Sequence, residues 1–284
     1  MKYIITLFLS ITYSVSLLAN VSDSEKKILI KLYQSTNGNQ WNVKWDLNSP
    51  VSTWYGVTIE NRNIVSINLS NNNLVGTIPS EIVGLKSLEE LNFFKNQISG
   101  TIPERIGELK KLERLNLAFN KLTGSIPNSI CEIQHLKSIM LFMNKLSGEI
   151  PNEIGNLKEL EVVSLFNNQL SGKLPNSLYK LGNLKELMLS SNAISGEISP
   201  NISSLVSLKK LSLFDNKMSG AIPFNMTKLE NLENVNLAYN SFTGQVPILL
   251  TKKNGFNLTM RDQSGIAFKL EVANSTKGIL ANDE

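Results

Sequence analysis

The residue types that most often carry out chemistry are sparse in this sequence of 284 residues. It holds one cysteine, Cys131, and one histidine, His135, so no internal disulfide is possible. A thiol becomes reactive only when a neighbour lowers its pKa. Cys131 falls in a turn or short helix and His135 opens the strand that follows, with no evident partnership between them. We therefore expect Cys131 to be a small, partly buried filler.

The remaining candidates for catalysis are carboxylates, and these are widely scattered. Neighbouring acids such as Glu89 and Glu90 fall on an expected strand, where successive side chains point to opposite faces. No Walker-type glycine loop and no cluster of metal ligands is found in the sequence. The sequence therefore predicts a protein that is not an enzyme and that uses no cofactor or metal.

Three tryptophans offer a different chemistry, because large aromatic rings bind ligands by stacking. Trp41, Trp45 and Trp54 lie within a loop-rich segment near the N-terminus. A ligand platform is one interpretation. We favour the other, in which the rings plug the open end of the array of repeats that follows.

Between Asn63 and about Asn254 the sequence repeats one pattern, LxxLxLxxNxLxGxIP. These repeats make up most of the chain and must position any functional residues. A fixed period of this length predicts a repeat architecture in which neighbouring units bury each other's apolar faces. A carboxamide both donates and accepts hydrogen bonds, so an inward asparagine can satisfy backbone groups in the stack. We expect a structural role for the eight asparagines, which stand 24 residues apart at Asn72, Asn96, Asn120, Asn144, Asn168, Asn192, Asn216 and Asn240.

Glycine and proline complete the pattern. A glycine stands four residues after each asparagine, which suits a compact loop. A proline follows it in seven of the eight repeats, whereas the sixth has Ser199 at that position and Pro200 after it. We expect the loop of the sixth repeat to deviate locally.

The segments outside the repeats give the predicted domain boundaries. Residues 1–19 combine a basic start with an apolar run and a small residue, which indicates a secretory signal peptide rather than a membrane anchor. Residues 20–62 form an N-terminal cap, with a helix expected over 22–32 and capped by Ser22 or Asp23. Residues 63–254 are the eight repeats. Residues 255–284 form a C-terminal cap, with a hairpin expected from strands over 256–260 and 265–272, and a loose tail.

In these residues the chain resembles extracellular leucine-rich-repeat proteins of the plant-specific type, typified by receptor ectodomains and polygalacturonase-inhibiting proteins. The run from Asn168 to Pro175 and the segment Trp54-Tyr55-Gly56-Val57 carry the match. The cap cysteines usual in the plant proteins are missing, which fits similar proteins exported by bacteria. The resemblance implies an α/β repeat fold, a right-handed leucine-rich-repeat solenoid with a parallel sheet on its concave face, a helical N-terminal cap and a short C-terminal cap.

The outward positions of the strands vary while the frame repeats. Alternation predicts that Arg114, Asn116 and Ala118 face outward in the third repeat, and equivalent positions then form columns about 4.7 to 4.9 Å apart. A contiguous exposed apolar patch usually marks an interaction site. The alternative is that the repeated phenylalanines only pack along one another. The predicted ligand-binding residues are Phe94, Arg114, Phe119, Met140, Phe142, Met143, Val162, Phe166, Met188, Phe214 and Tyr239.

Three classes of function follow from this surface. The first is an exported protein that binds a protein or peptide, in the secreted, periplasmic or cell-surface space. The second is a carbohydrate or cell-wall binder that uses polar residues such as Asn92, Asn116 and Asn236, and the third is a structural surface protein. The formal net charge of +4 comes from scattered lysines and arginines, so no nucleic acid is expected as a partner. No membrane span is expected in the mature chain.

Overall fold

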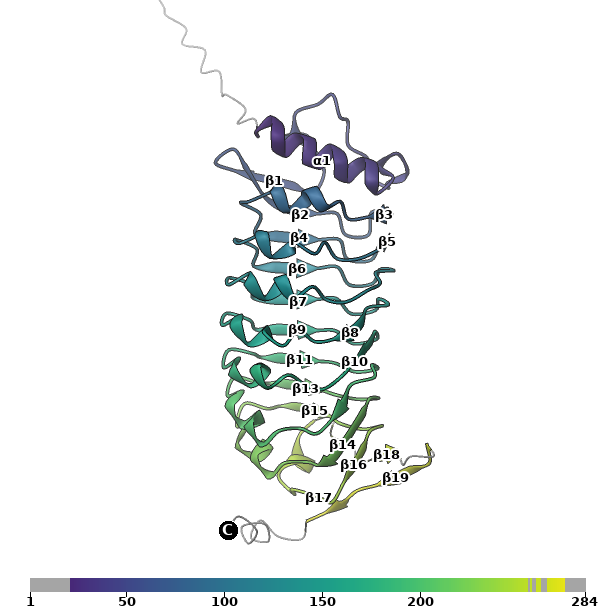
Figure 1. Cartoon of the computed structure of the whole chain (residues 1–284), viewed down its shortest axis with the longest axis vertical. Coiled ribbons are helices and arrows are strands. Elements are labelled where there is room, and N and C mark those ends of the chain that lie inside the picture. Colours follow the sequence, from purple (N-terminus) through teal and green to yellow (C-terminus); the bar gives the residue numbers. More distant parts are fainter. Residues whose placement is uncertain (1–20, 255, 257–258, 262–264, 274–284) are drawn as a thin grey trace, which may run out of the picture.

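The structure is a computed structural model, and it describes residues 21–254, 256, 259–261 and 265–273. The predicted signal peptide over 1–19 and the predicted tail over 274–284 lie outside the described residues. Within the described part, the repeats are stacked one on another into an elongated body (Figure 1). No helix in this part is both long and apolar enough to cross a membrane.

A sheet of nine strands runs the length of the stack (Figure 1). Its first two strands pair antiparallel and every later pair is parallel, in register at the repeat spacing, so that Leu91 lies beside Leu115. This confirms the predicted parallel sheet. The strands are β1 (Val57–Glu60), β2 (Asn63–Asn68), β4 (Glu90–Asn92), β6 (Arg114–Asn116), β7 (Ser138–Met140), β9 (Val162–Ser164), β11 (Glu186–Met188), β13 (Lys210–Ser212) and β15 (Asn234–Asn236).

The opposite side of each repeat is closed by a short 3-10 helix. Pro79, Pro127, Pro175 and Pro223 stand directly before such helices, where a fixed φ costs nothing and no donor is lost. The helices are η3 (Ser80–Gly84), η4 (Ile106–Glu108), η5 (Asn128–Glu132), η6 (Ile154–Asn156), η7 (Asn176–Lys180), η8 (Pro200–Ser204), η9 (Phe224–Lys228) and, in the eighth repeat, η10 (Leu250–Lys252).

Between the large sheet and these helices, smaller parallel ladders join the returning loops of adjacent repeats. Here the backbone of Gly172 has φ of +76°, and a Cβ on it would lie 2.6 Å from an oxygen of the Glu149 side chain. The positive φ favours glycine at this position, while the exposed Glu149 side chain could move aside for a Cβ. The strands are β3 (Val75–Thr77), β5 (Gln97–Ser99), β8 (Ser147–Glu149), β10 (Gln169–Ser171), β12 (Ser195–Gly196), β14 (Lys217–Ala221) and β16 (Ser241–Thr243).

One continuous apolar core fills the space between these layers. In the third repeat all seven predicted inward side chains are at most 5% exposed, which confirms the pattern from which they were derived. A single repeat does not enclose them, because the repeats before and after it cover their exposed sides. These residues are Leu112, Leu115, Leu117, Leu122, Ile126, Ile130 and Ile133.

The asparagines form a ladder of hydrogen bonds between repeats. The Asn144 Oδ1 accepts from the Leu122 backbone N–H at 3.0 Å, and its Nδ2 donates to the carbonyls of Leu117 and Leu141, both at 3.0 Å. Each of its neighbours in the array repeats this arrangement, as Asn168 does toward Leu146 and Leu141. The predicted structural role of the asparagines is therefore confirmed by the hydrogen bonds they make.

The loop of the sixth repeat was expected to deviate, and this prediction is wrong. Pro200 occupies the first position of η8, where the absence of an N–H breaks no hydrogen bond. The Ser199 hydroxyl accepts from the Asn201 backbone N–H at 3.2 Å and caps the turn. The helix η8 therefore stands 24 residues after η7, in step with the array.

The N-terminal end of the array is covered by helix α1 (Asp23–Ser35) and by the turns η1 (Gly38–Gln40) and η2 (Val51–Thr53). Ser22 is the N-cap and accepts from the Glu25 N–H at 3.2 Å, and the helix continues three residues beyond the predicted end.

The three tryptophans of this region are at most 4% exposed. Trp45 stacks on Trp54 with ring centroids 4.8 Å apart, and Trp41 meets Trp45 edge-on at 4.8 Å. Each indole N–H donates to a backbone carbonyl, as Trp41 does to Thr36 at 3.0 Å. This confirms that the rings plug the end of the array rather than form an exposed platform.

At the C-terminal end, β18 (Thr259–Arg261) and β19 (Ala267–Lys269) form the expected antiparallel pair. The second predicted strand, over 265–272, is in fact divided, because β20 (Glu271–Val272) leaves the hairpin and pairs parallel with β17 (Gln245–Val246). The predicted domain boundaries at these ends stay predictions.

The ladder gives a first test. Replacing Asn144 by Ala leaves the Leu122 N–H without its partner and removes one of two donors from the carbonyls of Leu117 and Leu141, which keep their bonds from Asn120 and Asn168. We therefore expect a loss of about 1 to 3 kcal/mol in the free energy of unfolding. Urea unfolding followed by circular dichroism measures it. The exposed neighbour Lys145, replaced by Ala, is the control and should change stability by less than about 0.5 kcal/mol. Equal stability of the two variants would contradict the ladder.

Candidate functional site

The outward side of the nine-stranded sheet, called the sheet face below, presents its side chains in columns. In the three-residue strands the first and third residues point outward, and the parallel pairing sets Glu90 beside Arg114, and Arg114 beside Ser138. Three residues separate each strand from the asparagine of the ladder, and the last two of them form two further columns. The predicted candidate residues all lie in these four columns.

The charges of the first column, and of the residues just before it, are paired across repeats. The Arg114 guanidinium lies 3.6 Å from the Glu90 carboxylate and 3.1 Å from Glu113, and the Lys137 ammonium lies 3.0 Å from Glu113. The Lys137 hydrogen bond holds the pKa of Glu113 below its ordinary value, although burial opposes it. Lys210 binds Glu186 at 2.8 Å, and this hydrogen bond raises the pKa of the lysine. Cations and anions on this face therefore compensate each other.

The two columns after the strands carry an aromatic ledge, defined here as Phe94, Phe142 and Phe166 from the first of them and Phe119 from the second. Phe142 and Phe166 are stacked, with centroids 4.4 Å apart and planes at 10°. Phe94 meets Phe142 at 6.2 Å and Phe119 at 6.3 Å, the latter edge-on. The structure therefore brings four predicted residues from four repeats into one contiguous ring surface. The packing of the rings on one another, which was the alternative prediction, is also present.

Ala118 was predicted to face outward, and it is fully buried. The ring centroids of Phe94 and Phe142, from the repeats on either side, lie 6.2 Å apart. A methyl group is small enough to leave them this space. Ala238, at the equivalent position of the eighth repeat, is fully buried as well. Alternation along the strand predicts the direction in which a side chain points. It does not predict whether side chains of neighbouring repeats cover it.

The residues of the last outward column lie in a turn that follows the strands. Phe119, Met143 and Tyr239 were predicted as strand residues, but their backbones are left-handed, with φ of 60°, 54° and 57°. The chain turns here so that the next residue, an asparagine of the ladder, points inward. Such a turn is favoured by asparagine, which stands at this position as Asn71 and Asn167. The recurring asparagine was the one available signal for the turn.

The other predicted residues are less exposed than expected. Phe119 is 41% exposed, while the apolar side chains around it, taken from the same prediction, are half-buried. Phe214 and Tyr239 form a separate pair with centroids 5.1 Å apart. Sequence reasoning did not single out Ser138, whose buried hydroxyl has no hydrogen-bond partner in the described residues. The half-buried residues are Phe94, Met140, Phe142, Met143, Val162, Phe166, Met188, Phe214 and Tyr239.

The polar residues that could bind a sugar serve the fold instead. Asn92, Asn116 and Asn236 each accept, through Oδ1, the backbone N–H two residues later, at 3.0, 3.2 and 3.2 Å. This side-chain turn shapes the backbone just before the left-handed residue. The carboxamide oxygens are thus engaged in the chain's own structure.

The two residues with catalytic potential are placed apart from the sheet face. Cys131 lies in η5 and is 4% exposed, and burial raises the pKa of its thiol to about 12. The His135 Nδ1 lies 3.0 Å from the Glu159 carboxylate, and both are exposed. In the described residues no three metal-ligating side chains come together. The absence of catalysis stays a prediction.

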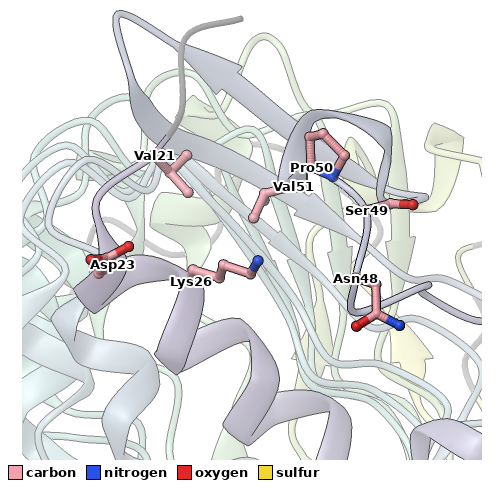
Figure 2. A pocket seen from close by; sticks show the side chains of 7 residues that line it. All are labelled: Val21, Asp23, Lys26, Asn48, Ser49, Pro50 and Val51. Atoms are coloured by element: carbon pink, nitrogen blue, oxygen red, sulfur yellow. The ribbon is translucent and has the colours of Figure 1, made fainter.

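A hollow of about 260 Å³ lies at the start of α1, and Figure 2 shows the side chains that line it. Its one cationic side chain, Lys26, has its ammonium 6.0 Å from the centre of the Trp54 ring. The Ser49 hydroxyl in its wall donates to Asp46 at 2.6 Å, and this bond lowers the pKa of the aspartate. The polar groups are thus used in holding the cap together.

Comparison with known proteins identifies the repeats. Two family models match, one described as a leucine-rich repeat region over residues 117–247 and one as a leucine-rich repeat over 63–85 and 87–109. The comparison with curated proteins finds no match. Many solved chains share the fold.

Among the similar solved structures is the PEPR1–AtPEP1 complex, with 30% identity and a TM-score of 0.73, covering 79% of this chain and 32% of that one. The Arabidopsis receptor kinase HAESA, solved with the peptide hormone IDA and the co-receptor SERK1, is 30% identical with a TM-score of 0.65, over 83% of this chain and 45% of that one. A leucine-rich-repeat protein of Leptospira interrogans is 36% identical with a TM-score of 0.54, over 63% and 43%. The chain thus spans less than half of each of these proteins.

The raised pKa of Cys131 gives a test of the interpretation that it is a filler. At pH 8 the native thiol is protonated and enclosed, so we expect its reaction with dithiobis-nitrobenzoate to be at least about a hundredfold slower than in urea-unfolded protein. Absorbance of the released thiolate follows the reaction. Because the unfolded thiol ionises at lower pH than the folded one, stability should also fall as pH rises from 9 toward 12. Native labelling as fast as unfolded labelling would contradict this account.

Proposed function

Because the chain is built from leucine-rich repeats, we propose that it is an exported, non-catalytic protein that binds a peptide or an extended protein segment on its sheet face. The observation that carries the proposal is the aromatic ledge, four rings in mutual contact on the outward side of the sheet. Phe119 is 41% exposed there. Aromatic anchors of this kind supply much of the energy of protein recognition.

The arrangement of the ledge suits recognition because it is rigid. The rings stand on strands whose backbones are paired on both sides and whose following turns are tied by the asparagine ladder. Little side-chain entropy is lost when a ligand settles on rings that already contact one another. The paired charges beside the ledge add no net charge that would demand an oppositely charged ligand.

Two further lines support the proposal. The similar HAESA structure was solved with a peptide hormone, so a solenoid of this kind can hold a peptide. The apolar run from Tyr3 to Leu18 after a basic start has the composition of a secretion signal. Binding of carbohydrate through the face asparagines has less support, because their oxygens are used in the backbone turns.

Selection from a phage-displayed library of random dodecapeptides tests the proposal. We expect the full chain to enrich a defined set of peptides, and Phe142→Ser with Phe166→Ser to weaken them at least about tenfold, since each ring lost costs more than about 1 kcal/mol of binding. Calorimetry on the selected peptides measures the affinities.

The matched control is Val206→Ser, which removes a side chain that is 60% exposed on the turn before β13 and not on the sheet face. Circular dichroism establishes that all variants fold. If selected peptides bind the ledge variants as tightly as the parent, the ledge is not the site. If no peptide is enriched at all, the proposed function itself is wrong.

A further inference from the structure

The sheet face carries the same small constellation twice, which we call the two aromatic corners. The first consists of Phe94, Ala118 and Phe119. The second lies 120 residues, or five repeats, further along the chain and consists of Phe214, Ala238 and Tyr239. In each corner a phenylalanine follows one strand, and an alanine and then an aromatic residue follow the next strand.

The two corners also share their geometry. The rings of Phe94 and Phe119 meet at 6.3 Å with planes at 63°, and those of Phe214 and Tyr239 meet at 5.1 Å with planes at 73°. Both alanines are fully buried. Each corner therefore combines an edge-to-face pair of rings with a buried alanine, at the same place in its repeat.

In each corner, one residue has a backbone conformation that its residue type disfavours. Phe119 and Tyr239 adopt left-handed conformations, which asparagine tolerates better than an aromatic residue, and asparagine does stand at this position as Asn71 and Asn167. Phe119 recovers little of that cost by burial, since 41% of it is exposed. An aromatic ring at such a position contributes more to ligand binding than to the stability of the fold.

The charges of the face define the ligand further. The four outward columns hold three carboxylates and three cations, so their formal charges sum to zero. A face of this kind complements a ligand without net charge, because either sign would leave desolvated charges without a partner. The carboxylates belong to Glu90, Glu186 and Asp215, and the cations to Lys95, Arg114 and Lys210.

We propose that the ligand is an extended peptide segment without net charge, held at two apolar side chains, one on each aromatic corner. The inference rests on the proposed function and specifies its ligand. Five strand spacings separate the corners, so they stand about 24 Å apart along the sheet. An extended peptide advances about 3.3 Å per residue, so the two anchors lie six to eight positions apart in its sequence. The stacked pair Phe142 and Phe166 lies under the segment between them.

A series of synthetic peptides tests the spacing. The probes are acetylated and amidated peptides in which two phenylalanines are separated by serine and threonine spacers of increasing length, compared with peptides that hold one phenylalanine. Fluorescence polarisation gives the affinities. We expect a maximum when the phenylalanines are six to eight positions apart, at least about tenfold above the single-phenylalanine peptide, because the second anchor binds intramolecularly. Equal affinity at all spacings would overturn the inference.

Two variants connect this maximum to the corners. Phe119→Asn and Tyr239→Asn introduce the residue that the same column already holds in other repeats, so the left-handed turn is preserved. Each variant should bind the best two-anchor peptide no more tightly than the single-anchor peptide, while Phe119→Asn melts at the same temperature as the parent or higher. Ser191→Asn, in the same column outside both corners, is the control and should keep the maximum. A maximum that survives in either corner variant contradicts the proposal.

The outcome separates this inference from the proposed function. If library dodecapeptides bind but show no pair of apolar residues six to eight positions apart, the two-anchor model is wrong and peptide binding stands. If the library yields no peptide and the affinity of the synthetic peptides does not change with spacing, both the two-anchor model and the proposed function are wrong.

Discussion

The structure depends on one constraint: the backbone groups that turn inward between stacked repeats must find hydrogen-bond partners without water. The carboxamide of asparagine meets this need because it donates twice and accepts on one short side chain. Asn144 connects two carbonyls from adjacent repeats and the N–H of a loop, and the other asparagines from Asn96 onward do the same along the stack, while Asn72 binds the backbone of Val43 in the N-terminal cap. An aspartate could not donate to those carbonyls, so the stacked repeats require asparagine at this position.

Because the frame is satisfied internally, the outward positions are free to vary. Strands of three residues give each repeat only a few such side chains, and the register between strands places them in columns. Two kinds of contact then develop between repeats, ion pairs such as Arg114 with Glu90 and ring contacts such as Phe142 with Phe166. The first removes net charge from the sheet face and the second builds an apolar surface on it. Both features favour an extended, uncharged ligand over an ionic one.

The sequence was sufficient to predict what the period imposes: the parallel sheet, the inward leucines, the structural asparagines and the plugging tryptophans. It was insufficient where the outcome depends on neighbours in other repeats. Ala118 is fully buried at a position that alternation turns outward, and the loop at Pro200 stays regular because a proline suits the first turn of a helix. The left-handed turn at Phe119 carries no signal in its own residue type. Four of the predicted ligand-binding residues, those of the aromatic ledge, are brought together by the fold, and their role stays a proposal.

The central claim is that a rigid frame presents exposed rings on the sheet face to a peptide, and photo-crosslinking tests it directly. A benzophenone amino acid at position 119 preserves the aromatic character of Phe119, and the same residue at position 206 reports on a surface off the sheet face. After irradiation with a library-selected peptide, mass spectrometry should find peptide adducts from position 119 and none from position 206. Adducts from position 206 alone would contradict the account.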